Sequence, residues 1–359
     1  MAVTVTEIAR KAGVSKGLVS RVLRDDQSLR ITESRRQQVL AVAKGLGGIK
    51  RNSSGRVIGK RLARNIVVPI NKTSVMQELL AHWENQGFKT LKSVLGEHGF
   101  RLSIDLYESD SPAALQEEYQ ILKGTCDGLV LLGGIVTKQV ANFVLENKIP
   151  HVSIDSVGRV LGVNTVLEDA VAGYYQAVSH LSELGHTRIG FLGRTEQGHY
   201  PSFAAAMAHH GLDINPAWRC RSPRTSQPIP DKETGWRDAA REAFGQWLDD
   251  HGPQVTAICC HNDYGALGAC DAMVERNLVP GKDLSIVGFG DFERPGAPQT
   301  QDFELTTIHT SLADLGRSTA DSLISQILYK KTQVVHQLIP TELMIRHTTG
   351  ACLRPDANG

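Results

Sequence analysis

Long hydrophobic runs and closely spaced cysteines are both scarce in this chain of 359 residues. The best apolar stretch, residues 128–136, is interrupted by two adjacent glycines and is too short for a membrane helix, which needs about 18 residues. The amino terminus lacks an apolar signal core, so we expect a cytoplasmic protein that contacts no membrane. Of six cysteines only Cys259 and Cys260 are close in sequence, which favours reduced thiols over disulfides or zinc.

Motifs for catalysis and metal binding are also missing. The sequence contains no G-x-S-x-G elbow, no Walker loop and no H-E-x-x-H. The pair His209-His210 has no visible partners for a metal, and Gly133-Gly134 is not a dinucleotide fingerprint. We therefore expect no catalytic residues, no metal and no cofactor, and an enzyme on an α/β fold is a minor alternative.

The net charge of +1 conceals a strong asymmetry along the chain. Residues 1–62 contain 14 Lys and Arg against 4 Asp and Glu, a balance of +10. The remaining 297 residues contain 25 Lys and Arg against 34 Asp and Glu, a balance of −9. A small basic segment before a large acidic one indicates binding to a polyanion, with a merely solvated basic surface as the alternative.

Three short helices are predicted in the basic segment. Thr4 begins a capping box, S/T-x-x-E, and Gly13 ends the helix that follows. Ser15 can cap a second helix over Lys16–Leu23, and Thr32 can cap a third. The inward faces at helical spacing are Ile8, Ala9 and Ala12 in the first helix, Val19, Val22 and Leu23 in the second, and Val39, Val42, Ala43 and Leu46 in the third.

Two short helices joined by a tight turn and braced by a third are typical of a helix-turn-helix DNA-binding domain. The second helix exposes Lys16 and Arg21, and both side chains can donate to guanine in the major groove. The alternative is a three-helix bundle with a purely structural role.

The segment VTVTEIARKAGVSKGLVSRVL resembles the amino-terminal signature of the LacI/GalR family of bacterial transcriptional repressors, and the similarity continues through ITESRRQQVLAVAKGLG. The resemblance implies base reading at Lys16, Gly17 and Arg21, although Gly17 has no side chain with which to read a base. It implies phosphate contacts around Thr4, Ser15, Ser20, Arg24, Thr32 and Arg35. Residues 1–47 would form the DNA-binding domain.

Residues 48–62 are basic and rich in glycine and serine, which alone indicates a flexible linker. In the family this segment becomes a short helix on operator DNA and wedges an apolar side chain into the minor groove. The resemblance implies that Asn52 and Arg56 contact DNA and that Ile58 is the wedge. Arg51 in place of a proline and Gly55 in place of a helix former depart from the family pattern.

From residue 63 to residue 345 apolar runs alternate with helical patterns, which favours doubly wound parallel α/β sheets. The predicted strands are Asn65–Ile70, Leu102–Leu106, Gly128–Leu132, His151–Ile154, Arg188–Leu192, Ala257–Cys260 and Ser285–Phe289. The predicted helices are Met76–His98, Pro112–Lys123, Lys138–Asn147, Glu168–Leu184, Ser202–His210, Glu233–Asp250 and Tyr264–Arg276.

The segments GHTRIGFLG, HNDYGALGACDAM, DLSIVGFGD and LTTIHTSLADLG are similar to the family's effector domain. The resemblance implies a periplasmic-binding-protein-like fold of two α/β lobes with a ligand cleft between them, followed by a tail at residues 346–359. It places the three crossings between lobes near Val157–Val163, Asp291 and Asp321. It also implies a homodimer, in which two DNA-binding domains address two half-sites.

Four candidate ligand-binding residues follow the predicted strands, because ligands of such sheets bind at the carboxyl ends of strands: Asn71, Met76, Asp155 and Asn262. The resemblance adds His199 and Asp291 as candidates. Asp155 and Asn262 match effector-contacting positions of the family, although Asp155 could be a turn residue. His199 stands where the family usually has an arginine, and Gly290 stands where it usually has a carboxylate.

These features predict a sequence-specific transcriptional regulator, a repressor by resemblance, that binds double-stranded operator DNA. A small effector between the lobes, expected to be a sugar or a sugar acid, would control operator affinity. A small-molecule receptor without DNA function is the alternative, and the basic segment argues against it.

Overall fold

The computed structural model describes residues 5–23, 29, 31–45, 62–71, 86–107, 125–132, 136–154, 161–193, 199–221, 235–251, 254–291 and 303–353. Packing divides the chain into two units, Met1–Ala63 and Arg64–Gly359, which we call the head and the body. Each unit has a hydrophobic core of its own.

The head contains the three predicted helices, α1 (Val5–Ala12), α2 (Lys16–Leu23) and α3 (Glu33–Gly45). Every predicted inward residue of α1 and α2 is buried, and so are Val39 and Ala43 of α3. Ser15 caps α2 as expected, since its Oγ accepts a hydrogen bond from the backbone N–H of Leu18 at 3.2 Å. Gly13, with φ of +65°, makes the turn before α2. Thr4 and Leu46 lie outside the described residues.

The body contains two six-stranded sheets, each of which forms the centre of one lobe. The sheet of lobe 1 has the order β11-β5-β4-β3-β1-β2, and that of lobe 2 has the order β12-β10-β9-β8-β6-β7. All neighbouring strands are parallel except β10 and β12, which are antiparallel. The strands of lobe 1 are β1 (Asn65–Asn71), β2 (Arg101–Tyr107), β3 (Gly128–Leu132), β4 (His151–Ile154), β5 (Thr165–Glu168) and β11 (His336–Ile339). Those of lobe 2 are β6 (Ile189–Leu192), β7 (Arg219–Cys220), β8 (Ala257–Cys260), β9 (Ser285–Gly290), β10 (Thr307–Thr310) and β12 (Thr341–Met344).

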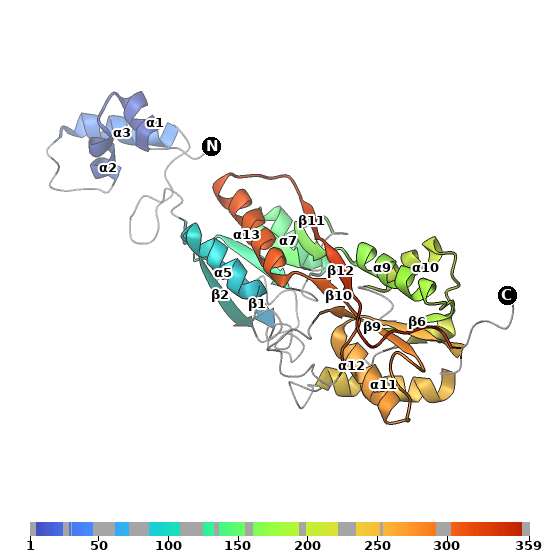
Figure 1. The fold of residues 1–359 in the computed structure, drawn as a ribbon. Helices are drawn as coiled ribbons and strands as arrows, with labels where there is room; N and C mark the ends of the chain where they lie inside the picture. Colours follow the sequence, from blue (N-terminus) through green and yellow to red (C-terminus); the bar gives the residue numbers. More distant parts are fainter. Residues whose placement is uncertain are drawn as a thin grey trace. The chain divides into compact units, whose positions relative to one another are not determined.

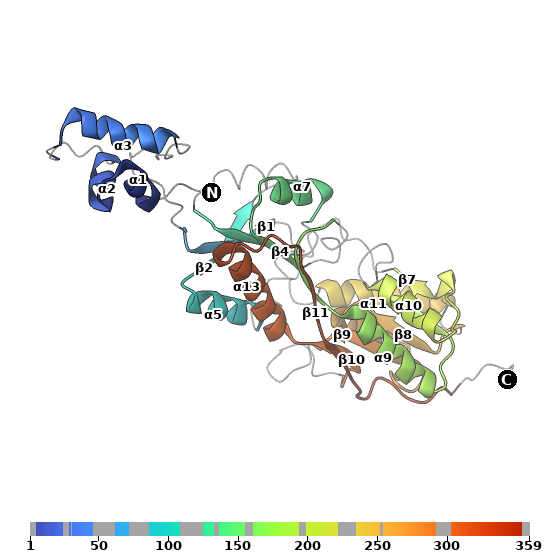
Figure 2. The same ribbon diagram turned by 90° about the horizontal axis from the view of Figure 1, so that it is seen from above.

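Helices cover the sheets in pairs. Lobe 1 carries α5 (Gly87–Glu97), α7 (Lys138–Glu146) and α13 (Leu312–Leu328), and lobe 2 carries α9 (Ala170–Glu183), α10 (Tyr200–His209), α11 (Gly235–His251) and α12 (Asp263–Val274). Figures 1 and 2 show α9 and α10 on one face of the lobe 2 sheet and α11 and α12 on the other. In lobe 1, α5 and α13 approach closely at a glycine, because a Cβ added to Gly316 would lie 2.2 Å from the carbonyl oxygen of Gly87.

The seven predicted strands are all present, within a residue or two of their predicted bounds. Five short strands, β5, β7, β10, β11 and β12, and the helix α13 were not predicted. Five predicted helices are found near their expected bounds. Of the helix predicted over 76–98, the structure shows residues 87–97, and the one predicted over 112–123 lies outside the described residues.

Within the described residues the chain crosses between the lobes three times, but not at the predicted positions. The crossings follow β5 at Asp169, β10 at Ser311 and β11 at Pro340. The first prediction failed because the chain adds β5 to lobe 1 before leaving it. Asp291 is followed by another strand of the same lobe, and Asp321 lies inside α13.

Candidate functional site

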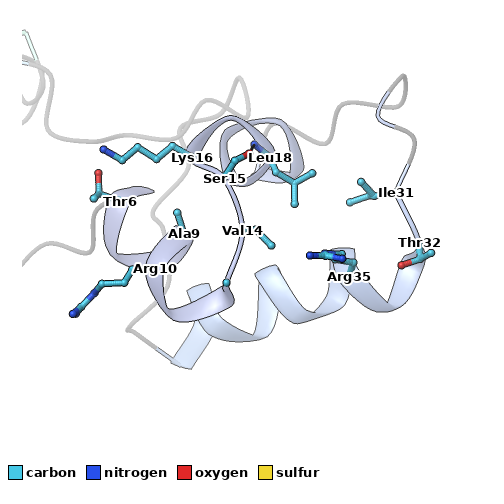
Figure 3. Close-up of a pocket in the computed structure, with 11 residues that line it drawn as sticks. Thr6, Ala9, Arg10, Val14, Ser15, Lys16, Leu18, Ile31, Thr32 and Arg35 are labelled. Carbon is cyan, nitrogen blue, oxygen red and sulfur yellow. Dashed lines mark hydrogen bonds between the residues drawn. The ribbon is translucent and has the colours of Figure 1, made fainter.

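The head has a hollow of about 940 Å³ between its helices, in the part of the chain that the structure describes. It is lined by Thr6, Ala9, Arg10, Gly13, Val14, Ser15, Lys16, Leu18, Ile31, Thr32 and Arg35. In Figure 3, Arg35 points from α3 towards Val14, and Lys16 extends from the start of α2 towards Thr6. The hollow is therefore an exposed surface that concentrates cationic side chains at the amino end of α2.

Four residues that the sequence predicted to contact DNA lie together along this hollow: Ser15, Lys16, Thr32 and Arg35. Thr6 and Arg10 also line it, and the sequence analysis missed both. Their spacing of four residues on the exposed side of α1 was the available signal.

The remaining described DNA-binding candidates lie farther along α2. Gly17 and Arg21 are exposed, four residues apart on one face, and Ser20 is partly buried beside them. The buried residues Val19 and Val22 occupy the opposite face, which holds α2 against the head core. A Cβ added at Gly17 would meet only Ser15 Oγ, at 4.0 Å, so this position has room for a side chain.

Several predicted site residues lie outside the described residues: Thr4, Arg24, Asn52, Arg56, Ile58, Met76 and Asp155. Asn71 ends β1, at the edge of lobe 1 where ligands are expected.

In the body, His199 lies just before α10 and joins the two lobes. Its Nε2 is 3.0 Å from Oε1 of Glu168, which ends β5 in lobe 1. Its Nδ1 is 3.0 Å from the carbonyl oxygen of His261, which follows β8 in lobe 2. Both ring nitrogens are therefore engaged at the first crossing between the lobes.

The aromatic surroundings of His199 hold its ring in place. The ring centroid lies 4.1 Å from that of Phe289 and 5.7 Å from that of Tyr174, both of which are buried. Tyr174 is fixed in turn, since its hydroxyl donates to the carbonyl oxygen of Cys260 at 2.9 Å. Sequence reasoning identified His199 but missed Glu168, whose nearest partner is 31 residues away in the other lobe.

The charge of Glu168 depends on this partner. Burial alone would raise the pKa of its carboxyl group. The hydrogen bond to His199 and the charge of that ring outweigh burial, and a backbone hydrogen bond and His261 contribute less. The pKa of Glu168 therefore lies below its ordinary value. Glu168 is therefore an ionised carboxylate between the lobes at neutral pH.

Asn262 begins α12, and its Oδ1 accepts a hydrogen bond from the backbone N–H of Gly265 at 2.8 Å. The side chain is partly exposed, so it both caps the helix and lies at the carboxyl end of β8. Its neighbour Asp263 is fully buried and accepts a hydrogen bond from Thr307 Oγ1 at 2.5 Å.

Asp291, another predicted ligand contact, is held in a buried ion cluster. Its side chain is 2% exposed, and its two oxygens lie 2.6 Å from Nη2 of Arg346 and 3.1 Å from Nδ1 of His309. Arg346 also donates to the carbonyl oxygen of Leu305 at 2.6 Å. The cluster ties β9 and β10 to the chain that follows β12.

No group of three or more His, Cys, Asp or Glu side chains in the described residues is arranged to hold a metal ion. None of the helices that the structure describes is both long and apolar enough to span a membrane.

Family comparisons divide the chain in the same way as its packing. Residues 4–47 match the model of bacterial regulatory proteins of the lacI family, and residues 178–349 match the periplasmic binding protein-like domain. The transcriptional repressor PurR of Haemophilus influenzae is 27% identical, over 98% of this chain and 99% of its own length. The repressor CytR of Escherichia coli is 26% identical, over 98% of this chain and 97% of its own length.

Solved structures show the same fold over the whole chain. A complex of the transcriptional regulator CelR with cellobiose has a TM-score of 0.66 and 22% identity, covering 97% of this chain and all of that one. A lac repressor dimer bound to operator and the anti-inducer ONPF has a TM-score of 0.65 and 24% identity, covering 98% of this chain and all of that one. With a lacI-type helix-turn-helix head, a two-lobed periplasmic-binding-protein-like body and repressors as full-length relatives, the chain belongs to the lacI family and is a DNA-binding transcriptional regulator.

Proposed function

We propose that this protein is a repressor whose α2 reads operator DNA in the major groove. Lys16 and Arg21 would contact base edges, and Gly17 lies between them on the exposed side of α2. The phosphate contacts would come from Ser15, Ser20, Thr32 and Arg35, with Thr4 and Arg24 as further candidates. The observation that carries this proposal is the hollow at the amino end of α2, where Lys16 and Arg35 gather beside the Ser15 cap.

Charge and helix geometry explain how such a surface would act. Cationic side chains that neutralise phosphates release condensed counterions, which makes affinity depend strongly on salt. The bidentate fork of an arginine can pair with O6 and N7 of guanine, which makes affinity depend on sequence. Arg35 would thus supply sequence-independent affinity, and Arg21 would supply discrimination.

The proposed phosphate contact of Arg35 can be tested by measuring affinity for a random duplex by fluorescence anisotropy at several salt concentrations. Arg35→Ala should reduce the slope of log affinity against log salt by about one. Lys92→Ala removes one positive charge from an exposed position on α5 in the body and serves as the control. An unchanged salt slope in Arg35→Ala, or an equal loss in Lys92→Ala, would contradict the assignment of this surface.

We further propose that operator affinity is controlled by a small ligand, a sugar or a sugar acid, bound between the lobes. His199 contacts the carbonyl oxygen of His261, which follows β8, and Asn262 is the next residue, so both lie at the carboxyl end of that strand and support this placement. Asp155 and Asn71 would contribute from lobe 1, and Met76 is a further candidate from the same lobe. Asp291, which pairs with His309 and Arg346, would stabilise lobe 2 rather than contact the ligand.

A thermal-shift screen over sugars, sugar acids and sugar phosphates tests this part, because a ligand that binds only the folded state raises its melting temperature. Asn262→Asp is the sharper variant, since it keeps an oxygen to cap α12 and removes the amide donors. We expect it to weaken the ligand response while ligand-free DNA binding stays close to wild type. A wild-type ligand response in Asn262→Asp and Asp155→Ala would place the ligand elsewhere.

The remaining parts of the proposal concern organisation. Residues 1–47 would bind DNA, and residues 63–345 would bind the ligand and form the dimer. Residues 48–62 would be a hinge between them. In this hinge Asn52 and Arg56 would contact DNA, and Ile58 would wedge into the minor groove. The protein would act in the cytoplasm as a homodimer, without a catalytic activity. Ile58→Ala should lower operator affinity and DNA bending while ligand binding is retained.

A further inference from the structure

The Glu168–His199 pair carries no net positive charge, although His199 stands where the family usually has an arginine. The carbonyl oxygen of His261 can only accept, so Nδ1 of His199 carries a proton and donates it. Nε2 lies 3.0 Å from a carboxylate oxygen of Glu168, so any positive charge on the ring is matched by the negative charge of that carboxylate.

Glu168 is a partly exposed carboxylate at the junction. Its side chain is 28% exposed, compared with 14% for His199. Among the acidic side chains that the described residues place after β5, β8 and β9, Asp169 caps α9 through a bond to Ala172, whereas Asp263 and Asp291 are almost completely buried. A ligand at the junction would thus meet the carboxylate of Glu168 rather than those of its neighbours.

The surroundings of the pair combine aromatic rings with a few polar groups, which is the usual composition of a small-molecule site. Phe289 and Tyr174 pack against the ring of His199, and the ring of His261 lies 4.9 Å from it, so the polar groups here are the two imidazole edges and the carboxylate of Glu168. A carboxylate accepts strong, charge-assisted hydrogen bonds from hydroxyl groups. An anionic group placed beside the same carboxylate is repelled, and the paired His199 offers no surplus cation to compensate.

We propose that Glu168 determines the specificity of the effector site, and that the Glu168–His199 pair selects a neutral polyhydroxylated ligand over an anionic one. This inference rests on the proposed ligand-binding function and narrows its ligand class.

The test uses the full-length protein and sugars that differ from one another only by a charged group. The probes are D-glucose and D-glucuronate, D-galactose and D-galacturonate, and D-ribose and D-ribose 5-phosphate. Affinities are measured by titration calorimetry and thermal shift at constant ionic strength. We expect at least one neutral sugar to bind, at least tenfold more tightly than its charged counterpart.

Three variants separate specificity from folding. Glu168→Gln removes the charge and should reduce the neutral-to-anionic ratio to within about threefold, whereas Glu168→Asp keeps the charge and should retain the ratio. Glu304→Gln is the matched control, because Glu304 also pairs with a histidine, His347, but on the exposed surface. The ratio of affinities distinguishes specificity from a structural role, since loss of folding would weaken both ligands alike.

Three results would overturn the proposal: no neutral sugar binds, an anionic sugar binds as tightly as its neutral counterpart, or Glu168→Gln keeps the full ratio. Salt-dependent binding to random duplex DNA is measured on the same preparation. If DNA binding persists while any of these results occurs, the ligand class is wrong and the regulatory function stands. If DNA binding is also absent, the proposed function itself fails.

Discussion

Replacing Asp291 by asparagine should destabilise the body, because this carboxylate is the anionic centre of a buried ion cluster. Its side chain is 2% exposed, while Arg346 and His309 are 23% and 18% exposed. Asparagine is the suitable replacement, since Asp291 has a φ of +61°, a conformation that asparagine tolerates better than alanine. The substitution therefore removes the charge without adding backbone strain.

The magnitude follows from the cost of leaving a buried cation without its partner, about 3–5 kcal/mol. Arg346 keeps its bond to the carbonyl of Leu305 and is partly hydrated, so we expect the lower end, about 3 kcal/mol. At roughly 2–4 °C per kcal/mol for a domain of this size, the melting temperature should fall by about 6–12 °C.

The assay is thermal unfolding of the full-length protein followed by circular dichroism at neutral pH. Glu304→Gln, whose carboxylate is 67% exposed beside His347, is the control and should shift the transition by about 1 °C or less. A melting temperature for Asp291→Asn within 2 °C of wild type would refute the structural role of the cluster. Loss of ligand binding at an unchanged melting temperature would instead make Asp291 a ligand contact.

Three further predictions concern the head core, a helix contact and a buried histidine. Ile8→Ala, at a fully buried position, should cost about 2–5 kcal/mol, enough to abolish DNA binding by the small head while the thermal transition of the body is unchanged; retained DNA affinity would contradict this. Gly316→Ala should lower the melting temperature, because the added Cβ would clash with a backbone carbonyl of α5. Gly96→Ala, where an added Cβ meets nothing within 4 Å, should raise the melting temperature slightly. Equal shifts of the two variants in thermal unfolding would refute the contact. Burial lowers the pKa of His151 below its ordinary value near 6.5, despite a hydrogen bond to a backbone carbonyl, and its Nε2 accepts from the N–H of Asn164. The unfolded chain therefore takes up a proton that the folded one does not. The free energy of unfolding keeps its full value above about pH 6.5 and falls as the pH is lowered below it. Thermal unfolding of His151→Gln should show a weaker pH dependence than that of wild type.

The three helices of the head could be predicted from sequence, because their signals are local. The capping residue Ser15, the turn at Gly13 and the inward spacing of Val19 and Val22 lie within ten residues of one another, and each acts on its own helix. The candidate DNA-binding residues of α2 follow directly, since a helix with one buried face exposes the other.

The body was predicted in class but not in connectivity. Strands such as β3, with five consecutive buried residues, are visible as apolar runs. In contrast, β11 is exposed at three of its four positions, and β7 has only two residues, so neither has a periodicity to detect. The three crossings depend on such short strands, which form through pairing with distant segments.

The candidate ligand site was predicted in part for the same reason. Asn262 was found because it follows a strand and precedes a helix, and His199 was found through the family resemblance. Glu168 was missed and the burial of Asp291 was not foreseen, since their partners lie 31 and 55 residues away along the chain. The chemistry of both carboxylates is set by contacts that only the folded structure brings together.

Selection of duplexes from a random DNA pool by the full-length protein tests the central claim, that α2 reads sequence. Wild type should enrich a site with two half-sites related by two-fold symmetry, as two heads of a dimer require. Arg21→Ala should enrich the same site with the preference lost at one base pair of each half-site, at a cost of about 1–3 kcal/mol there. No enrichment by wild type, or an identical preference in Arg21→Ala, would contradict the reading of DNA by α2.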